Sequence, residues 1–199
     1  DAIQFLMDYF SLSFVDALKE LCQKTGVQFP EDQSIRKSTP ESMRQRQVRS
    51  DHKKLLLEAA RFYRSRLASN SVAISYLKKR GISGEVAAKF HIGYAGNSWN
   101  NLKEVFSDYE ANSNLFLVGL IKKSESGKKV FDRFRNRIIF PIFNKNGEVI
   151  AFGGRAIGDD NNAPKYLNSP ETDLFVKSKE LYGFFDAHRF IAKSQFVMV

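Results

Sequence analysis

The spacing of the apolar residues changes part-way along this chain of 199 residues, and that change limits the fold more than any other feature. Apolar residues in Ala2–Tyr9 and Phe14–Cys22 recur every three or four positions, which predicts a pair of helices. From Leu120 onward, short apolar runs are separated by Ser126-Gly127 and Asn146-Gly147, dipeptides that suit tight hairpins. Helices followed by hairpins predict an α+β fold, with helices packed on a small antiparallel or mixed sheet.

The middle of the chain is predicted to be helical as well. After Pro40, a long helix is expected with apolar residues on one face and these cations on the rest: Arg44, Arg46, Arg49, Lys53, Lys54, Arg61, Arg64 and Arg66. The periodicity leaves two readings equally open, a helix whose cations face water and a helix that contacts nucleic acid. Ser71 is then expected to cap a short helix ending near Arg80, and Ser83 to start another before the extended segment His91–Ala95.

The sequence at each end of the chain is typical of an incomplete domain. The helix pair in residues 1–28 has too few apolar residues for a core of its own, which indicates the remnant of a domain. Residues 29–50 open with a polar stretch and are predicted to be a linker, and residues 51–195 then form the main domain. A helix over Phe185–Lys193 is expected to lead into a strand at residues 196–199. We therefore expect the sequence to be a piece of a longer protein.

The charge of the chain indicates the class of its partner. Lys and Arg number 31 against 22 Asp and Glu, and the resulting net charge of +9 favours a polyanion such as nucleic acid. No apolar run approaches the roughly 20 residues that cross a bilayer, and the first residues lack the basic-then-apolar order of a secretory signal, so we expect no membrane partner. The single cysteine, Cys22, suits a reducing compartment, and we expect a cytoplasmic protein.

Metal and covalent chemistry are not indicated within this chain. His52, His91 and His188 lie far apart in the sequence and have no cysteine or carboxylate partners at ligand spacing. Asp159-Asp160 lies in a polar loop, where turn chemistry explains it better than metal binding. We therefore expect no metal ligand and no catalytic residue here.

Arg133, Arg135 and Arg137 alternate along the sequence, a spacing that suits a binding surface for a nucleic-acid backbone. In an extended strand these side chains would share a face at a spacing of about 7 Å, near the phosphate spacing of an extended single strand. An alternative of about equal weight is the solvent face of an amphipathic strand, with Phe134 turned inward.

Two later segments offer further contacts for phosphates and bases. Gly153-Gly154 removes side chains next to Arg155, whose planar fork matches phosphate oxygens, although paired glycines also mark a bulge or bend. Lys165, Tyr166 and Asn168 place a point charge, an aromatic plane and an amide within a short segment, and a nucleotide can use all three. Two more cations follow, Lys177 and Lys179.

Taken together, these segments resemble the bacterial DnaG-type DNA primase family, and the resemblance spans nearly the whole chain. It is carried by Lys79-Arg80-Gly81, Ile92–Ala95, Phe131–Arg137, Phe140-Pro141-Ile142, Phe152–Arg155, Lys165–Thr172 and Leu181-Tyr182-Gly183. The resemblance implies that residues 1–28 are the helical end of a zinc-binding domain and that residues 51–195 are the N-terminal subdomain of the RNA polymerase core. Residues 196–199 would then be the first strand of a truncated Toprim subdomain, continued by Glu-Gly in the longer protein.

The resemblance also implies a function, the synthesis of short RNA primers on single-stranded DNA. The family's basic cleft residues, which bind template or nucleotide, carry over to Arg80, Arg133, Arg135, Arg155, Lys165, Tyr166, Asn168 and Lys177, with Arg137 and Lys179 as second-rank candidates. Mg²⁺ would be bound by the missing Toprim subdomain and Zn²⁺ by the missing N-terminal part, so this piece alone is expected to be inactive. The implied partners are the DNA template, ribonucleoside triphosphates, the RNA primer and, through a missing C-terminal domain, the replicative helicase.

Two other functions remain open from the residues themselves. A non-catalytic module that binds single-stranded nucleic acid would use the same cations and aromatic rings. A protein-interaction adaptor would instead use the basic helix Arg44–Arg66 to meet an acidic partner.

Overall fold

A computed structural model of the chain describes residues 2–10, 14–27, 40–124, 126–127, 129–158 and 164–187. The chain divides into two compact units, one of residues 1–46 with 188–199 and one of residues 47–187. Residues 29–39, Asp159-Asp160, His188 and the strand expected at 196–199 lie outside the described residues. Of the helix expected over Phe185–Lys193, only residues 185–187 are described, and they are helical.

The first unit contains the predicted helix pair, α1 (Ala2–Phe10) and α2 (Phe14–Thr25). Among its described side chains, those of Leu6, Ala17 and Cys22 are buried. Gly26 follows α2 with φ +67°, the left-handed conformation that commonly ends a helix. That this pair is the remnant of a domain stays a prediction.

Helix α4 (Pro40–Ala68) is the long basic helix, 29 residues in length. It begins at Pro40, whose fixed φ suits a first helical turn, so residues 40–50 are helical although they belong to the range 29–50 predicted as a linker. One stripe of α4 is buried at helical spacing, formed by His52, Leu56, Ala59, Tyr63 and Leu67.

Two antiparallel sheets follow, as the hairpin dipeptides predict. Strands β1 (Gly93–Ala95), β4 (Arg137–Phe143), β5 (Val149–Ala156) and β6 (Tyr166–Asn168) form a four-stranded sheet in the order β1-β4-β5-β6. Asn146-Gly147 lies in the turn between β4 and β5, with Gly147 at φ +77°. Strands β2 (Ile121–Lys123) and β3 (Val130–Asp132) pair on either side of Ser126-Gly127. The predicted α+β class is confirmed.

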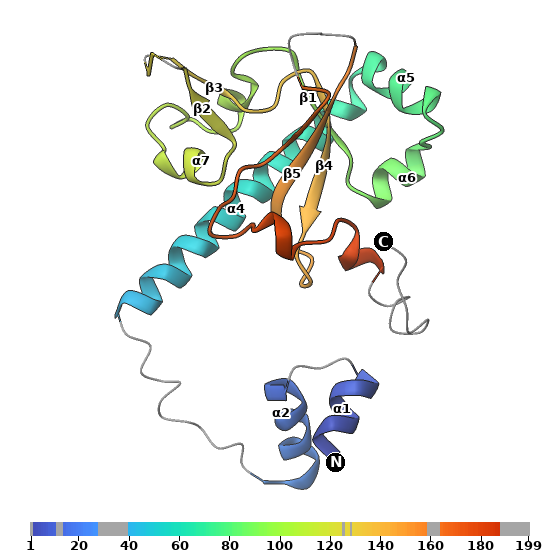
Figure 1. The fold of residues 1–199 in the computed structure, drawn as a ribbon, viewed down its shortest axis with the longest axis vertical. Coiled ribbons are helices and arrows are strands. Elements are labelled where there is room, and N and C mark those ends of the chain that lie inside the picture. Colours follow the sequence, from blue (N-terminus) through green and yellow to red (C-terminus); the bar gives the residue numbers. More distant parts are fainter. Residues whose placement is uncertain are drawn as a thin grey trace. The chain divides into compact units, whose positions relative to one another are not determined.

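Helix α4 and the two helices that follow it pack against the four-stranded sheet. Helix α4 runs behind β4 and β5 in Figure 1, and Tyr63 meets Phe152 edge-to-face at 5.5 Å. Gly93 permits this close approach, because a Cβ at that position would lie 2.6 Å from Tyr63 Cβ. Helices α5 (Ser71–Lys79) and α6 (Gly84–Lys89) pack near the β1 side of the sheet, where Leu77 and Ile138 are buried in one cluster.

The caps of the two short helices were only partly predictable. Asn70, and not Ser71, caps α5, and its side chain accepts a hydrogen bond from the Ala73 N–H at 2.8 Å. Ser83 caps α6 as predicted, accepting from the Val86 N–H at 3.2 Å. Three short helical elements were not predicted: η1 (Asn101–Glu104), α7 (Ser113–Leu117) and η2 (Lys177–Lys179). Within the described part of the chain, no helix is both long and apolar enough for a membrane span.

Candidate nucleic-acid interface

Most of the predicted site residues line two hollows that share strand β6. The first, of about 360 Å³, is called here the Arg155 hollow, and its lining includes Arg155, Tyr166, Asn168 and Lys177. The second, of about 380 Å³, is called the Arg135 hollow, and its lining includes Arg133, Arg135 and Arg137. Because side chains alternate along a strand, Tyr166 and Asn168 face the first hollow while Leu167 faces the second.

The guanidinium of Arg155 is held between two tyrosines in the Arg155 hollow. Its Nε donates to the Tyr76 hydroxyl and its Nη1 to the Tyr166 hydroxyl. The register pairs Arg155 of β5 with Tyr166 of β6, and the Arg155 Cζ lies 5.0 Å from the Tyr166 ring centroid. The hydrogen bond to Tyr76 raises the pKa of Arg155 above its ordinary value. Arg80 lies over the same Tyr76 ring at 5.5 Å, so both cations share one aromatic support.

Gly153 and Gly154 of β5 face opposite sides of the strand, and each leaves room for a different neighbour. A Cβ at Gly154 would lie 2.8 Å from Phe134 Cδ1 and 3.1 Å from Arg137 Cδ, so this glycine makes room for the core. Gly153 faces the Arg155 hollow, and a Cβ there would lie 3.2 Å from Asn168 Oδ1. The register shift between β4 and β5 falls at Ile142/Phe143, so the glycines do not form the bulge.

Of the three lysines predicted for the site, Lys177 lines one of the two hollows, whereas Lys165 and Lys179 line neither. Lys177 lines the Arg155 hollow, and its backbone N–H donates to both carboxylate oxygens of Glu171, at 3.1 and 3.2 Å. Lys165 is exposed, its carbonyl accepts from the Ala156 N–H at 3.0 Å, and its side chain lines neither hollow. The same is true of the side chain of Lys179.

The expectation that three arginines form one row on a strand is wrong. Strand β3 ends at Asp132, Asn136 adopts the left-handed conformation with φ +48°, and β4 begins only at Arg137. The chain therefore turns between the second and third arginine, and the row is broken. Phe134 is fully buried, as the inward orientation predicts.

Each arginine consequently has its own environment. Arg133 donates from Nε and Nη2 to the Asn168 carbonyl, at 3.1 and 2.9 Å, and its partial burial lowers its pKa. Arg137 is only 4% exposed, and its Nη1 faces the carbonyls of Gly154 and Lys165, so it lines the Arg135 hollow from a largely buried position. The Arg135 Cζ lies 3.2 Å from the ring centroid of Trp99, and its Nη1 is buried without an acceptor among the described residues.

Trp99 is a site residue that the sequence reasoning missed. Trp99 is 60% exposed as a residue and lines the Arg135 hollow, and its carbonyl accepts from the Asp132 N–H at 2.8 Å. It is the chain's one tryptophan, which was the available signal, but its stacking on Arg135 is a long-range contact that local patterns do not reveal.

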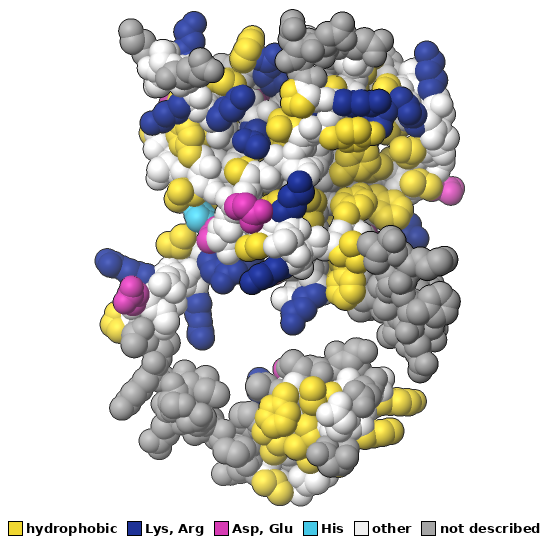
Figure 2. Space-filling view, in the orientation of Figure 1, with side chains coloured by type: hydrophobic (Ala, Val, Ile, Leu, Met, Phe, Trp, Pro, Cys, Tyr) yellow, Lys and Arg dark blue, Asp and Glu magenta, His cyan; other side chains and the backbone are white. Residues whose placement is uncertain are grey.

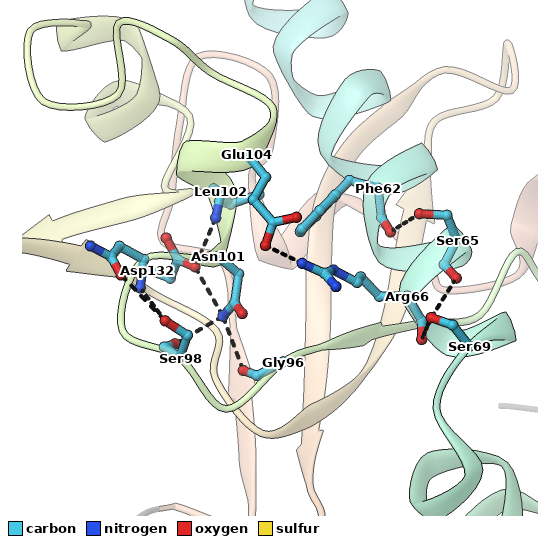
Figure 3. Close-up of polar contacts among 11 residues, drawn as sticks. Phe62, Ser65, Arg66, Ser69, Gly96, Ser98, Asn101, Leu102, Glu104 and Asp132 are labelled. Carbon is cyan, nitrogen blue, oxygen red and sulfur yellow. Dashed lines mark hydrogen bonds and ion pairs between the residues drawn. The ribbon is translucent and has the colours of Figure 1, made fainter.

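A buried carboxylate fixes the loop that carries Trp99. The side chain of Asp132 accepts from the Leu102 N–H at 3.2 Å and from Asn101 Nδ2 at 3.4 Å (Figure 3). It also accepts from the Tyr109 hydroxyl at 2.7 Å. Asn101 Nδ2 also donates to the carbonyls of Gly96 and Ser98, at 3.2 and 2.8 Å. Burial raises the pKa of Asp132 to about 6. In the same view, Arg66 of α4 pairs with Glu104 of η1, which ties this loop to the long helix.

The histidines in the described part of the chain do not form a metal site. His52 is buried, its Nδ1 lies 2.9 Å from Asp173 Oδ1, and its Nε2 is buried without a hydrogen-bond partner among the described residues. Within residues 2–10, 14–27, 40–124, 126–127, 129–158 and 164–187, no three His, Cys, Asp or Glu side chains come together as metal ligands.

Comparison with known proteins identifies the family. Residues 62–188 match the family described as the N-terminal domain of the DNA primase catalytic core. The chain belongs to this DNA primase family. It is 42% identical over 190 residues to the DNA primase of Legionella pneumophila, covering 92% of this chain and 30% of that protein. It is 40% identical over 193 residues to the DNA primase of Escherichia coli K12, covering 95% and 32%. The chain thus spans about a third of the length of these primases.

Solved primase structures share the fold. A DnaG primase catalytic domain bound to ssDNA matches with a TM-score of 0.67 and 41% identity, over 72% of this chain and 46% of that one. The Aquifex aeolicus primase, solved with its zinc-binding and RNA polymerase domains, matches with a TM-score of 0.65 and 31% identity, over 98% and 44%. The resemblance noted from the sequence is confirmed.

Proposed function

We propose that this chain supplies the template-binding and nucleotide-binding part of a DNA primase, an enzyme that synthesises short RNA primers on single-stranded DNA. The observation that carries the proposal is the Arg135 hollow, where a guanidinium stacks on an exposed indole and keeps one buried nitrogen without an acceptor in the described part of the chain. A charged donor without an acceptor is costly, and a phosphate oxygen from a bound strand would satisfy it.

The Arg135 hollow is proposed as the template side. Arg133 is already oriented by the Asn168 carbonyl through Nε and Nη2, which leaves its Nη1 for a phosphate. The exposed Trp99 ring offers a stacking surface for a base, a contact worth roughly 1–3 kcal/mol in single-strand binding. That the solved DnaG domain carries ssDNA supports this assignment.

The Arg155 hollow is proposed as the nucleotide or primer side. Arg155 stays charged between its two tyrosines and is suited to a phosphate group, while Asn168 is suited to a base edge or a ribose hydroxyl. Arg80 and Lys177 flank this side, the first through Tyr76 and the second in the lining itself. Lys165 and Lys179, whose side chains lie outside both linings, remain proposed as peripheral contacts for the nucleic acid.

The metals of a primase do not fit the described residues, which hold no suitable cluster of ligands. We propose that Mg²⁺ and Zn²⁺ are bound outside this chain, with residues 1–28 the helical end of a zinc-binding domain and residues 196–199 the entry to a Toprim subdomain. The match of the two-domain Aquifex structure over 98% of the chain supports the first assignment. A replicative helicase as partner and a cytoplasmic location complete the proposal.

Binding of single-stranded DNA by the chain with Arg135→Ala tests the template side. Loss of one phosphate contact should weaken binding and lower the log-log salt slope by about 0.7. Fluorescence anisotropy of a labelled oligothymidylate measures both quantities. Lys145→Ala, which removes an exposed cation in the β4–β5 turn, is the control and should bind as the wild type does. Equal affinities and slopes for the two variants would contradict the proposal.

Primer synthesis by the full-length protein separates a primase from a binding module. With Arg155→Ala, we expect synthesis to be lost even at saturating template, because the nucleotide is no longer positioned. A non-catalytic module would show weakened binding alone. If the affinity for single-stranded DNA does not change with salt concentration, the result would favour the protein-interaction adaptor, in which the basic helix binds an acidic protein.

A further inference from the structure

Beyond the two hollows, a third depression lies along the β2–β3 hairpin. Its volume is about 1000 Å³, and its lining shares Trp99, Lys122 and Phe131 with the Arg135 hollow. It continues to Lys123, Lys129 and Lys103. We call this depression the hairpin groove.

The boundary between the Arg135 hollow and the hairpin groove is a ladder of cations and aromatic rings. Arg135 stacks on Trp99 at 3.2 Å, Trp99 meets Phe131 edge-to-face at 5.4 Å, and Lys122 Nζ lies 4.9 Å from the Phe131 ring centroid. Cations and rings in alternation form the surface that a single strand requires, since the cations meet phosphates and the rings meet bases. The ladder leads out of the Arg135 hollow onto the hairpin.

The hairpin groove is rich in cations that carry no counter-charge from described residues. Glu110 pairs with Lys103 at 2.5 Å, so that lysine is already neutralised. No ion pair to a described residue is formed by Lys122, Lys123 or Lys129, and Lys123 lies over the Phe116 ring at 5.2 Å. Figure 2 shows Lys and Arg side chains gathered over the part of this face that β2 and β3 form in Figure 1.

The β2–β3 hairpin is also held in a fixed relation to Trp99. The Asp132 N–H at the end of β3 donates to the Trp99 carbonyl at 2.8 Å, and the Arg133 N–H donates to the Leu120 carbonyl at 2.9 Å. The groove is therefore in place before a ligand arrives, which reduces the ordering cost of binding.

We propose that the hairpin groove is a second segment of the single-strand path, which receives the sugar-phosphate backbone of the DNA template after it leaves the Arg135 hollow. The strand passes from Arg135 and Trp99 over Phe131, with Lys122 and Lys129 at its phosphates. This inference rests on the proposed function of the Arg135 hollow and adds the direction in which the template leaves it.

The length dependence of DNA binding tests this path. The wild-type chain should bind an oligothymidylate of about 12 nucleotides more tightly than one of about 5, because only the longer strand reaches the hairpin. Lys122→Ala with Lys129→Ala should abolish that gain and lower the salt slope for the longer strand by about 1.4, the value for two phosphate contacts. Binding of the shorter strand should weaken by at most the one phosphate contact of Lys122, a slope change of about 0.7, because Lys122 lines both the Arg135 hollow and the hairpin groove whereas Lys129 lines only the groove.

Two matched variants control for charge and for packing. Lys89→Ala with Lys145→Ala removes the same charge from exposed positions on α6 and in the β4–β5 turn, outside all three linings, and should keep the length dependence. Lys122→Arg with Lys129→Arg keeps the charge in the groove and should restore the gain. Circular dichroism spectra check that each variant is folded.

The possible results separate the two proposals. If the hairpin variant keeps the wild-type gain and slope while Arg135→Ala weakens binding, the path does not cross the hairpin and the template hollow stands. If Arg135→Ala has no effect on either strand, the template hollow itself is wrong. If both double-alanine variants lose the gain equally, net charge explains it and the hairpin groove is not a specific path.

Discussion

The buried carboxylate of Asp132 should make the stability of the fold fall as the pH rises through mildly acidic values. Its pKa is raised from 3.8 to about 6 in the folded chain, chiefly by burial, while its hydrogen bonds to Tyr109, Leu102 and Asn101 act in the opposite direction. The folded state therefore holds the proton more tightly than the unfolded state does. The stabilisation is complete below about pH 4 and is lost as the pH rises through about 6.

The size of the effect follows from the shift. A difference of about two pKa units corresponds to about 3 kcal/mol, because one unit is worth about 1.4 kcal/mol. Asp132→Asn removes the titration but keeps the shape of the side chain. We therefore expect the wild type to lose about 2–3 kcal/mol of unfolding free energy, relative to the variant, between about pH 4 and pH 7.

Urea denaturation of both proteins across this pH range measures the difference. Comparing the two slopes cancels the contribution of every other titrating group and any constant cost of the substitution itself. Asp108→Asn makes the same chemical change at an exposed carboxylate and is the control. Parallel stability curves for the wild type and Asp132→Asn would refute the reasoning, because the buried carboxylate would then titrate at its ordinary pKa.

Two further substitutions probe the sheet and the Arg155 hollow. Gly154→Ala places a Cβ 2.8 Å from Phe134 Cδ1, and this overpacking should lower the unfolding free energy by about 1–3 kcal/mol in urea denaturation. Tyr76→Phe removes the hydroxyl that orients Arg155 but keeps the ring, so nucleotide binding should weaken by up to about tenfold in calorimetric titration. Binding of a short oligothymidylate should not change, and parallel weakening of both ligands would show that the two hollows are not separate sites.

Local patterns predicted the sheets well. The dipeptides Ser126-Gly127 and Asn146-Gly147 located both hairpins, because a tight turn is decided by residues that are adjacent in sequence. The buried stripe of α4 followed from helical spacing for the same reason.

Several features of the candidate site could not be predicted from the sequence. The prediction of a row of three arginines was wrong because Asn136 adopts a positive φ and turns Arg137 toward the core. Asparagine tolerates a positive φ better than most residues, so Asn136 was the available signal, but one asparagine does not fix a turn. Trp99 and Tyr76 were missed because their role depends on contacts with Arg135 and Arg155, which lie far along the chain. Contacts of that kind are set by tertiary packing, which single-sequence patterns do not contain.

The two hydrogen bonds from the Arg133 guanidinium to the Asn168 carbonyl also protect an edge of the four-stranded sheet. Strand β6 is the last in its sheet among the described strands, and the backbone carbonyl of Asn168 points away from β5. An open sheet edge invites a strand from another molecule to add on and so promotes aggregation. Because Arg133 occupies that carbonyl with two donors, the side chain proposed to hold the template also shields the edge. Replacing Arg133 would therefore leave the edge of the sheet open to pairing with another molecule, in addition to removing a cation.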